Sequence, residues 1–295
     1  MKKIISIVLA ATGAFSAFAL PTMPEGWKLL NSGKCAEAEK VFREIAADAK
    51  EGYNGTIGLM FTLRRQRKNE DVVKEVDSWL EKNPQATINQ KSHLLVFKGN
   101  ALRDLQKYDE AFATYKSGVD MKSTNSNSSD CAKEYIALAV NIAKYDLAVA
   151  MYEQESKNPV AMNNVGFLVN AAQMCWKTNK GEEGLKLIAK AEKIKAPEWI
   201  KEHIYRVRGY LMRDCLKDFE GAVKAFEQAL ALPSLTESQK AVLWNNIGIA
   251  YEKDEEYEKA VEAYKKVGTF KTTGWFMRSA ANSAIRLQKK IDAGE

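Results

Sequence analysis

The chain has 295 residues, of which 46% are hydrophobic and 28% charged, and its formal net charge is +6. This length and hydrophobic content allow one or two ordinary domains, and the modest positive charge, dispersed among glutamates, argues against a dedicated nucleic-acid binder. The four cysteines occur without a CxxC or metal-ligand spacing, so no metal site is indicated.

The N-terminus has the pattern of a signal peptide. Two lysines follow Met1, and an uninterrupted apolar run over residues 4–18 ends in Ala-Phe-Ala at residues 17–19. A membrane anchor is the competing interpretation, but the run is shorter than the ~20 apolar residues that span a bilayer. We therefore expect cleavage after Ala19 and export by a bacterium to the periplasm or the exterior, with no stable membrane insertion afterwards.

A pattern of two small residues and one large apolar residue recurs through the rest of the chain. In its best copy, residues 244–267, Gly248 and Ala260 lie twelve apart and Tyr264 follows four residues later. That spacing is typical of two antiparallel helices that approach closely. Further copies are Gly26/Ala38/Phe42, Gly99/Ala111/Tyr115, Ala172/Gly184/Ile188 and Gly209/Ala222/Phe226. In the weakest copy, Met60/Val72/Val76, bulky residues replace the small ones, and Tyr145/Ala148/Tyr152 gives the second half of another copy.

Three segments depart from this pattern. Gly209 and Ala222 need one extra residue in the turn between their helices. Residues 123–130 are polar throughout and predict an exposed connection, with Asp130 capping a helix that begins near Cys131. Residues 274–291 place apolar side chains on one face and cations near the end, which predicts a lone helix that covers the last hairpin.

The repeated unit resembles the tetratricopeptide (TPR) repeat, whose period of ~34 residues is close to the spacing of these copies. The resemblance implies an all-α, right-handed α-solenoid of about seven helical hairpins plus a C-terminal capping helix. The predicted organisation is a signal peptide at 1–19, a repeat array at 20–271 and a capping helix with a tail at 272–295.

The resemblance also implies a binding surface, because TPR ligands contact first-helix positions on the concave face. In this sequence those positions are basic compared with the whole chain and have few acids nearby, Asp104, Asp214 and Glu252 being the nearest. With Trp176 and Tyr210 as apolar anchors, such a surface suits an acidic segment or a carboxylate terminus. Ordinary solvated positions are the alternative. The selected residues are Asn100, Arg103, Lys133, Gln173, Trp176, Lys177, Arg206, Tyr210, Arg213 and Asn245.

The carboxylate-clamp subtype of the family is not predicted. Arg206, Asn246 and Arg278 occupy matching positions. However, Tyr210 and Gly274 stand where that subtype has an asparagine and a cation.

No catalytic site is indicated. The two histidines, His93 and His203, fall about three hairpins apart, and we expect surface or capping roles for them. A compact pocket that gathers either histidine with carboxylates would argue against a scaffold. Cys175 and Cys215 fall on neighbouring hairpins, where a disulfide is one alternative and buried free thiols are the default.

The sequence thus predicts a non-enzymatic exported scaffold, without cofactor or metal, that binds protein or peptide segments within a cell-envelope complex. The alternative is a helical-repeat protein that binds an envelope glycan or an acidic polymer through Trp176, Tyr210 and the nearby arginines. Self-association stays open.

Overall fold

The computed structural model describes residues 21–48 and 50–294, and this part of the chain contains helices and no strands. The predicted signal peptide lies outside the described residues. Within the described ranges, no helix combines the length and the apolar character that a membrane crossing requires.

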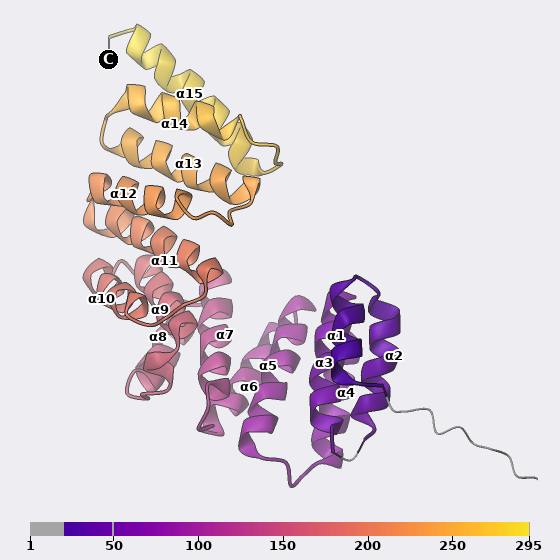
Figure 1. The fold of residues 1–295 in the computed structure, drawn as a ribbon. Coiled ribbons are helices and arrows are strands. Elements are labelled where there is room, and N and C mark those ends of the chain that lie inside the picture. The colour runs from indigo at the N-terminus through magenta and orange to yellow at the C-terminus, as the bar shows by residue number, and fades with distance from the viewer. Residues whose placement is uncertain (1–20, 49, 295) are drawn as a thin grey trace, which may run out of the picture. The chain divides into compact units, whose positions relative to one another are not determined.

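The described residues form seven successive helix pairs and a final single helix, which is the predicted all-α helical-repeat solenoid (Figure 1). The pairs are α1 (Met23–Asn31) and α2 (Cys35–Ala46), α3 (Gly52–Arg65) and α4 (Asn69–Lys82), α5 (Ile88–Asp104) and α6 (Tyr108–Asp120), α7 (Asn127–Asn141) and α8 (Tyr145–Glu155), α9 (Val165–Lys177) and α10 (Gly181–Glu192), α11 (Glu198–Tyr210) and α12 (Phe219–Leu230), and α13 (Glu237–Lys253) and α14 (Tyr257–Val267), followed by α15 (Trp275–Asp292).

The chain divides into two compact units between Val72 and Val73. The first unit contains α1, α2, α3 and the start of α4, and the second contains the rest of α4 and all later helices. Every residue predicted to contact a ligand belongs to the second unit.

Close approach of the paired helices depends on glycine. A Cβ atom built on Gly99 would lie 2.3 Å from the ring of Tyr115, and one on Gly248 would lie 2.6 Å from the ring of Tyr264. A methyl group at either position would push the two helices apart, since a close-packed core has no room for it. The small-small-large pattern therefore predicts these contacts correctly. Gly26 and Phe42, and Gly209 and Phe226, are related in the same way.

The sequence predicted that the extra residue of the sixth hairpin lies in the turn between its two helices. In the structure it lies within the first helix instead. Residues Leu211–Leu216 form a π-helical segment, η2, directly after α11. A π-helical turn takes up a one-residue insertion without breaking the helix.

Within the polar segment at residues 123–130, residues 124–126 form an exposed connection as predicted, but the connection ends at Ser126 and Asp130 does not cap the following helix. Helix α7 begins at Asn127 and includes Asp130, while Ser128 is buried. The Ser128 hydroxyl accepts a hydrogen bond from the backbone N–H of Ser123 (2.6 Å) and donates one to the carbonyl of Gly118 (3.0 Å). The hydroxyl groups thus satisfy buried backbone groups, which explains how a polar sequence becomes partly buried.

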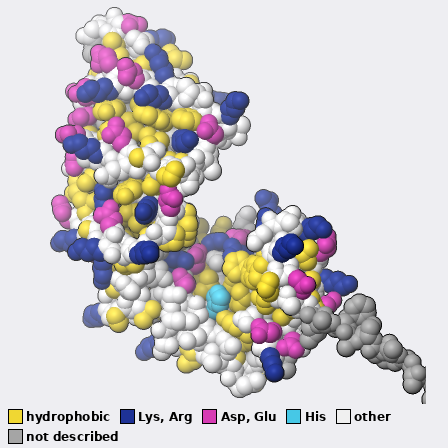
Figure 2. Space-filling view, viewed as in Figure 1, with side chains coloured by type: hydrophobic (Ala, Val, Ile, Leu, Met, Phe, Trp, Pro, Cys, Tyr) yellow, Lys and Arg dark blue, Asp and Glu magenta, His cyan; other side chains and the backbone are white. Residues whose placement is uncertain are grey.

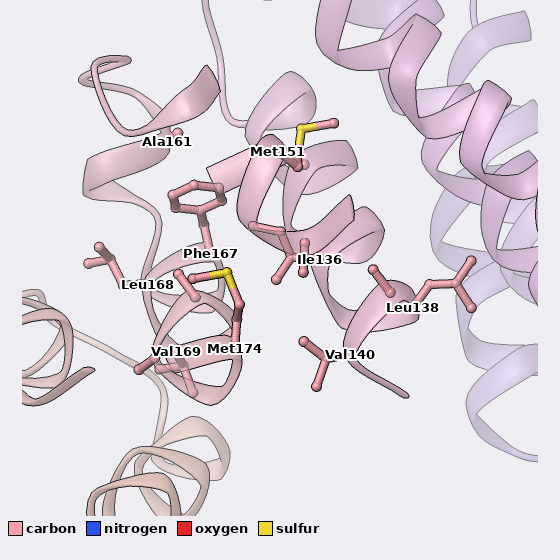
Figure 3. Close-up of a cluster of buried hydrophobic side chains, with 14 of the residues drawn as sticks. Ile136, Leu138, Val140, Met151, Ala161, Phe167, Leu168, Val169 and Met174 are labelled. Atoms are coloured by element: carbon pink, nitrogen blue, oxygen red, sulfur yellow. The ribbon is translucent and has the colours of Figure 1, made fainter. Parts of the chain in front are cut away.

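A continuous apolar core runs through the hairpins from α5 to α11. In Figure 3, Ile136 of α7, Met151 of α8, and Phe167 and Met174 of α9 converge on one another. At the end of the array, α15 buries Ala280, Ala284 and Leu287 against the cluster that contains Tyr264 of α14. The predicted capping helix is therefore present.

Candidate functional site

The ten predicted ligand-contacting residues lie on the first helices of consecutive hairpins in the second unit. We call the surface formed by α5, α7, α9, α11 with η2, and α13 the first-helix face. Asn100 and Arg103 lie on α5, Lys133 on α7, Gln173, Trp176 and Lys177 on α9, Arg206 and Tyr210 on α11, Arg213 on η2, and Asn245 on α13.

Two aromatic side chains of this face, from α9 and α11, stack on one another. The rings of Trp176 and Tyr210 stack with centroids 4.4 Å apart and planes inclined by 24°. The Nζ atom of Lys177 lies 3.7 Å from the Trp176 ring centroid, and the Trp176 Nε1–H donates a 2.9 Å hydrogen bond to Asp214. We call these rings and the charged groups around them the stacked-ring cluster; its charged members are Lys177, Glu202, Arg206, Arg213, Asp214 and Lys253.

Most cations of the stacked-ring cluster are paired. Arg206 lies 2.7 Å from Glu202, while Arg213 (2.8 Å) and Lys253 (3.1 Å) both contact Asp214. Burial alone would raise the pKa of Asp214, but the hydrogen bonds and charge of Arg213, together with Lys253 and Trp176, hold that pKa well below its usual range. Asp214 is therefore a carboxylate that joins three first-helix elements.

The π-helical segment places Arg213 and Asp214 in the stacked-ring cluster. One additional residue rotates the side chains that follow it by about 100° around a helix. From η2, Arg213 also donates a 2.8 Å hydrogen bond to Asn246 of α13. The sequence identified Asp214 only as one of the acids nearest to the predicted surface, and the extra residue in this hairpin was the signal that could have placed it in the site.

Lys133 and Arg103 form a second charged group on α5 and α7. Lys133 Nζ lies 3.2 Å from Asp130 and 3.3 Å from Glu134. Arg103 lies 3.0 Å from both Glu134 and Asp104. In this group, carboxylates offset the positive charges of Lys133 and Arg103. The positions of the two cations along their own helices did not indicate this pairing. In Figure 2, acidic and basic side chains are likewise interspersed on the visible face.

Three of the predicted residues are buried within the array. The side-chain oxygen of Asn100 accepts a 2.8 Å hydrogen bond from the Tyr115 hydroxyl, so this asparagine joins the two helices of its hairpin. Arg213 and Asn245 are 6% and 8% exposed. Their contacts lie mainly within the protein, whereas Trp176, Lys177, Arg206 and Tyr210 retain exposed surface.

A pocket of about 840 Å³, which we call the helix-start pocket, lies at the N-terminal turns of α7, α9 and α11. Its residues come from three hairpins, so no local pattern in the sequence marks it. Only Trp199, an exposed aromatic residue beside Pro197, gives a local hint. Its walls include Asp130, Lys133 and Glu134 of α7, Asn164 and Asn170 at α9, and Trp199 and His203 of α11.

Neither histidine caps a helix, and both are half-buried. His203 is half-buried in the helix-start pocket, and its Nε2 lies 3.3 Å from Oε1 of Gln173. Burial and the positive charge of Arg206 lower the pKa of His203 to about 4, so its imidazole is neutral at pH 7. His93 is also half-buried; burial lowers its pKa, against the influence of Asp130.

The four cysteines are free, so Cys175 and Cys215 are not joined by a disulfide. Cys215 contacts the carbonyl of Trp176 through its sulfur at 3.6 Å. In the described ranges no group of three or more His, Cys, Asp or Glu side chains has an arrangement that could hold a metal ion.

Two segments of the chain, residues 92–125 and 241–267, match the family model described as a tetratricopeptide repeat. No curated protein matches the chain at a significant level. The solved structures that resemble the chain have low sequence identities to it, so their similarity shows the fold alone.

Among solved structures, the chain is similar to a tetratricopeptide repeat protein from Parabacteroides merdae, with 16% identity, coverage of 89% of this chain and 96% of that one, and a TM-score of 0.57. It is also similar to the C-terminal part of a TPR repeat-containing protein from Cytophaga hutchinsonii, with 16% identity, coverage of 88% and 98%, and a TM-score of 0.54. A third match is a chain of the APC/C hetero-tetramer Cut9–Hcn1, with 12% identity, coverage of 89% and 48%, and a TM-score of 0.59.

Proposed function

Because this chain is a tetratricopeptide-repeat protein, we propose that it is a non-enzymatic scaffold that binds polypeptide segments along its first-helix face. The observation that carries the proposal is the stacked-ring cluster, where Trp176 and Tyr210 offer half-buried aromatic surface beside charged groups. Aromatic and arginine side chains are the types that contribute most to protein interfaces. The Cut9–Hcn1 structure is an assembly of different chains, which supports such a role for this fold.

The charges of the stacked-ring cluster favour an acidic partner. Its four cations, Lys177, Arg206, Arg213 and Lys253, stand against two carboxylates, Glu202 and Asp214. A carboxylate of a bound segment would supply the negative charge that this cluster lacks, and hydrogen bonds between ionised groups are about twice as strong as neutral ones. An acidic segment or a terminal carboxylate is therefore the proposed ligand.

Glycan binding through Trp176 and Tyr210, the alternative, has less support at this location. The Trp176 ring already stacks on Tyr210 and lies under the Lys177 ammonium group. A sugar that stacked on Trp176 would compete with these contacts. A peptide can instead approach from the rim of the cluster and pair with Lys177 and Arg206.

The helix-start pocket gathers His203 with Asp130 and Glu134, the combination that we expected to argue against a scaffold. Within the described part of the chain, however, His203 makes its hydrogen bond to Gln173 and none to a carboxylate. The two carboxylates are held by Lys133, through the ion pairs given above. General acid–base chemistry needs a base aligned on the group that it deprotonates, and we propose that this pocket performs no reaction.

We also propose that the chain is exported, on the basis of the apolar run at residues 4–18. In a bacterial host the full chain should then yield a mature protein whose first residue is Leu20. Mass spectrometry of the periplasmic and cytoplasmic fractions tests this. Full-length protein confined to the cytoplasm would contradict export without affecting the binding proposal.

A fluorescent peptide with alternating glutamate and leucine residues tests the binding proposal in an anisotropy titration. We expect Arg206→Glu to weaken binding by at least tenfold, because it reverses a charge beside Tyr210, and added salt to weaken it further. Trp176→Ala should weaken binding through lost aromatic contact. Lys224→Glu on α12 is the matched control, because Lys224 is exposed and lies outside the stacked-ring cluster.

Absence of peptide binding would contradict the proposal. If the acidic peptide and a neutral peptide both fail to bind the wild-type protein, the first-helix face is not a polypeptide site. Equal weakening by Lys224→Glu and Arg206→Glu would mean that only the overall charge matters.

A further inference from the structure

The helix-start pocket is a concavity of the second unit that shares Lys133 with the first-helix face but lies outside the stacked-ring cluster. Its volume of about 840 Å³ lies within the range of small-molecule sites in proteins. We propose that this pocket binds a neutral saccharide, with Trp199 as the surface on which a sugar ring stacks.

One wall of the pocket is fixed by internal hydrogen bonds. The wall consists of residues 124–126, which connect α6 to α7. Asn127 donates a 2.7 Å hydrogen bond from its side chain to the backbone carbonyl of Asn89, and Ser123 donates one of 2.5 Å to the Asn89 side chain. Together with the buried Ser128, these bonds hold the loop against α5 before any ligand arrives. A preformed wall lowers the entropic cost of binding.

The floor of the pocket is fixed as well. Asn164 caps α9 by accepting a 3.1 Å hydrogen bond from the Phe167 N–H, and its amide group donates to Asp130 at 3.1 Å. Asn170 donates from its side chain to the Lys133 carbonyl at 3.0 Å. These bonds leave one carboxylate oxygen of Asp130 and the amide oxygen of Asn170 without a hydrogen-bond partner among the described residues, so both can accept from a ligand.

Glycine at position 166 is part of this arrangement. A Cβ atom there would lie 2.6 Å from Cδ of Lys133. The missing side chain lets the Lys133 stem cross the floor, so that its ammonium group reaches both Asp130 and Glu134. A larger residue at position 166 would move the charge that balances these two carboxylates.

Each carboxylate of the pocket already has a cationic partner, and this bears on the class of ligand. Lys133 contacts both Asp130 and Glu134, so the lining has two carboxylates and one ammonium group and a small negative charge. Arg103, which does not line the pocket, contacts Glu134 and Asp104. His203 adds no charge at pH 7, because burial and Arg206 lower its pKa to about 4. A pocket with a small negative charge repels an anionic ligand, and carboxylates that are already paired give a cationic ligand little attraction to offset its loss of hydration. A neutral ligand is therefore favoured.

Trp199 supplies the apolar part of the site. Its side chain is 73% exposed although it lines the pocket, so a large indole surface faces solvent beside the polar groups. Such exposure is costly for a side chain of this size unless a ligand covers it. The flat C–H face of a pyranose ring covers an aromatic ring, while its hydroxyl groups donate to carboxylate and amide oxygens such as those of Asp130 and Asn170.

An extended peptide is the main competing occupant. The oxygens of Asp130 and Asn170 that can accept from a ligand lie in one pocket together with the exposed Trp199 ring. For this reason the geometry favours a compact ligand with many hydroxyl groups.

Ligand-observed nuclear magnetic resonance and calorimetry with diacetylchitobiose and maltose test the proposal on the whole protein. We expect at least one disaccharide to bind, Trp199→Ala to weaken its binding at least tenfold, and Trp199→Phe to keep it within about threefold, since tenfold corresponds to 1.4 kcal/mol. Ile285→Ala, at an exposed apolar residue of α15, is the matched control and should leave binding unchanged.

Two results would overturn the proposal. The first is the absence of saturable binding of both disaccharides at concentrations up to roughly 10 mM, where any remaining affinity is weak. The second is binding that Trp199→Ala leaves intact. If instead a neutral peptide binds and Trp199→Ala abolishes its binding, the pocket is a peptide site. Binding of the acidic peptide to the stacked-ring cluster should persist in Trp199→Ala, so this proposal and the scaffold proposal fail independently.

Discussion

At the scale of single residues, Asp214 is a carboxylate that joins three elements of the first-helix face. It contacts Arg213 of η2, Trp176 of α9 and Lys253 of α13. Its side chain is 24% exposed, so solvent screens part of each interaction. We predict that Asp214→Asn lowers the free energy of unfolding at pH 7 by roughly 1–2 kcal/mol, because the three partners lose a charged acceptor.

The effect of Asp214→Asn should depend on pH. The folded-state pKa of Asp214 lies below the value of ~3.9 for an unfolded aspartate, so its stabilising contribution is fully present above that value. The contribution is lost as the pH falls towards the folded-state pKa. Urea titrations of both proteins at pH 7 and pH 3 should therefore show a smaller difference at pH 3. Asp109→Asn, at a 95% exposed side chain, is the control; an unchanged difference at pH 3 would refute this role of Asp214.

At the scale of elements, several hairpins share one turn in which a residue other than glycine has a positive φ. Ala143, between α7 and α8, has φ 58°, and Gln106 and Glu255 have φ values of 61° and 63° in equivalent turns. This left-handed conformation costs roughly 1–2 kcal/mol for a residue with a Cβ atom, while glycine loses more chain entropy on folding. We predict that Ala143→Gly raises the free energy of unfolding by up to ~1 kcal/mol in urea denaturation.

Asn179→Gly provides the comparison for Ala143→Gly. Asn179 has φ 56° in the turn between α9 and α10, but asparagine tolerates this conformation better than alanine does. Its replacement should therefore give a smaller gain. If both substitutions destabilise the protein to the same extent, the cost of the left-handed turn does not limit stability here.

The helices could be predicted from the sequence because their pattern is local. The contact of Gly248 with Tyr264 joins residues sixteen apart, within a single hairpin. The place of an inserted residue or a polar side chain within its hairpin was harder to predict. The extra residue after Gly209 could be taken up in the turn or in the helix, and only packing on the next hairpin places it in η2. Ser128 is buried with its hydroxyl bonded to the Gly118 carbonyl of the preceding helix, a contact that composition alone does not indicate.

The candidate site could be predicted only in part, because its chemistry depends on contacts between hairpins. Arg103 and Glu134 are 31 residues apart, and Trp176 and Asp214 are 38 apart. Register within one helix identifies Trp176 and Arg103 as exposed positions on the first helix, but it does not show which carboxylate the neighbouring hairpin brings to them. The sequence therefore indicated more free positive charge than the structure has near Arg103.

At the scale of the whole molecule, a repeat array is stabilised by contacts between neighbouring units, so its ends determine how it unfolds. Helix α15 buries Leu287 and covers the cluster that contains Val261 and Val267 of α14. We predict that removal of residues 274–295 exposes this cluster and lowers protection from amide hydrogen exchange most strongly in α13 and α14, with progressively smaller effects towards α5. Hydrogen-exchange mass spectrometry measures this gradient. Lys289→Gln is the control, because it leaves the apolar contacts of α15 intact, and a uniform loss of protection across α5 to α14 would show that the array unfolds as a single cooperative unit.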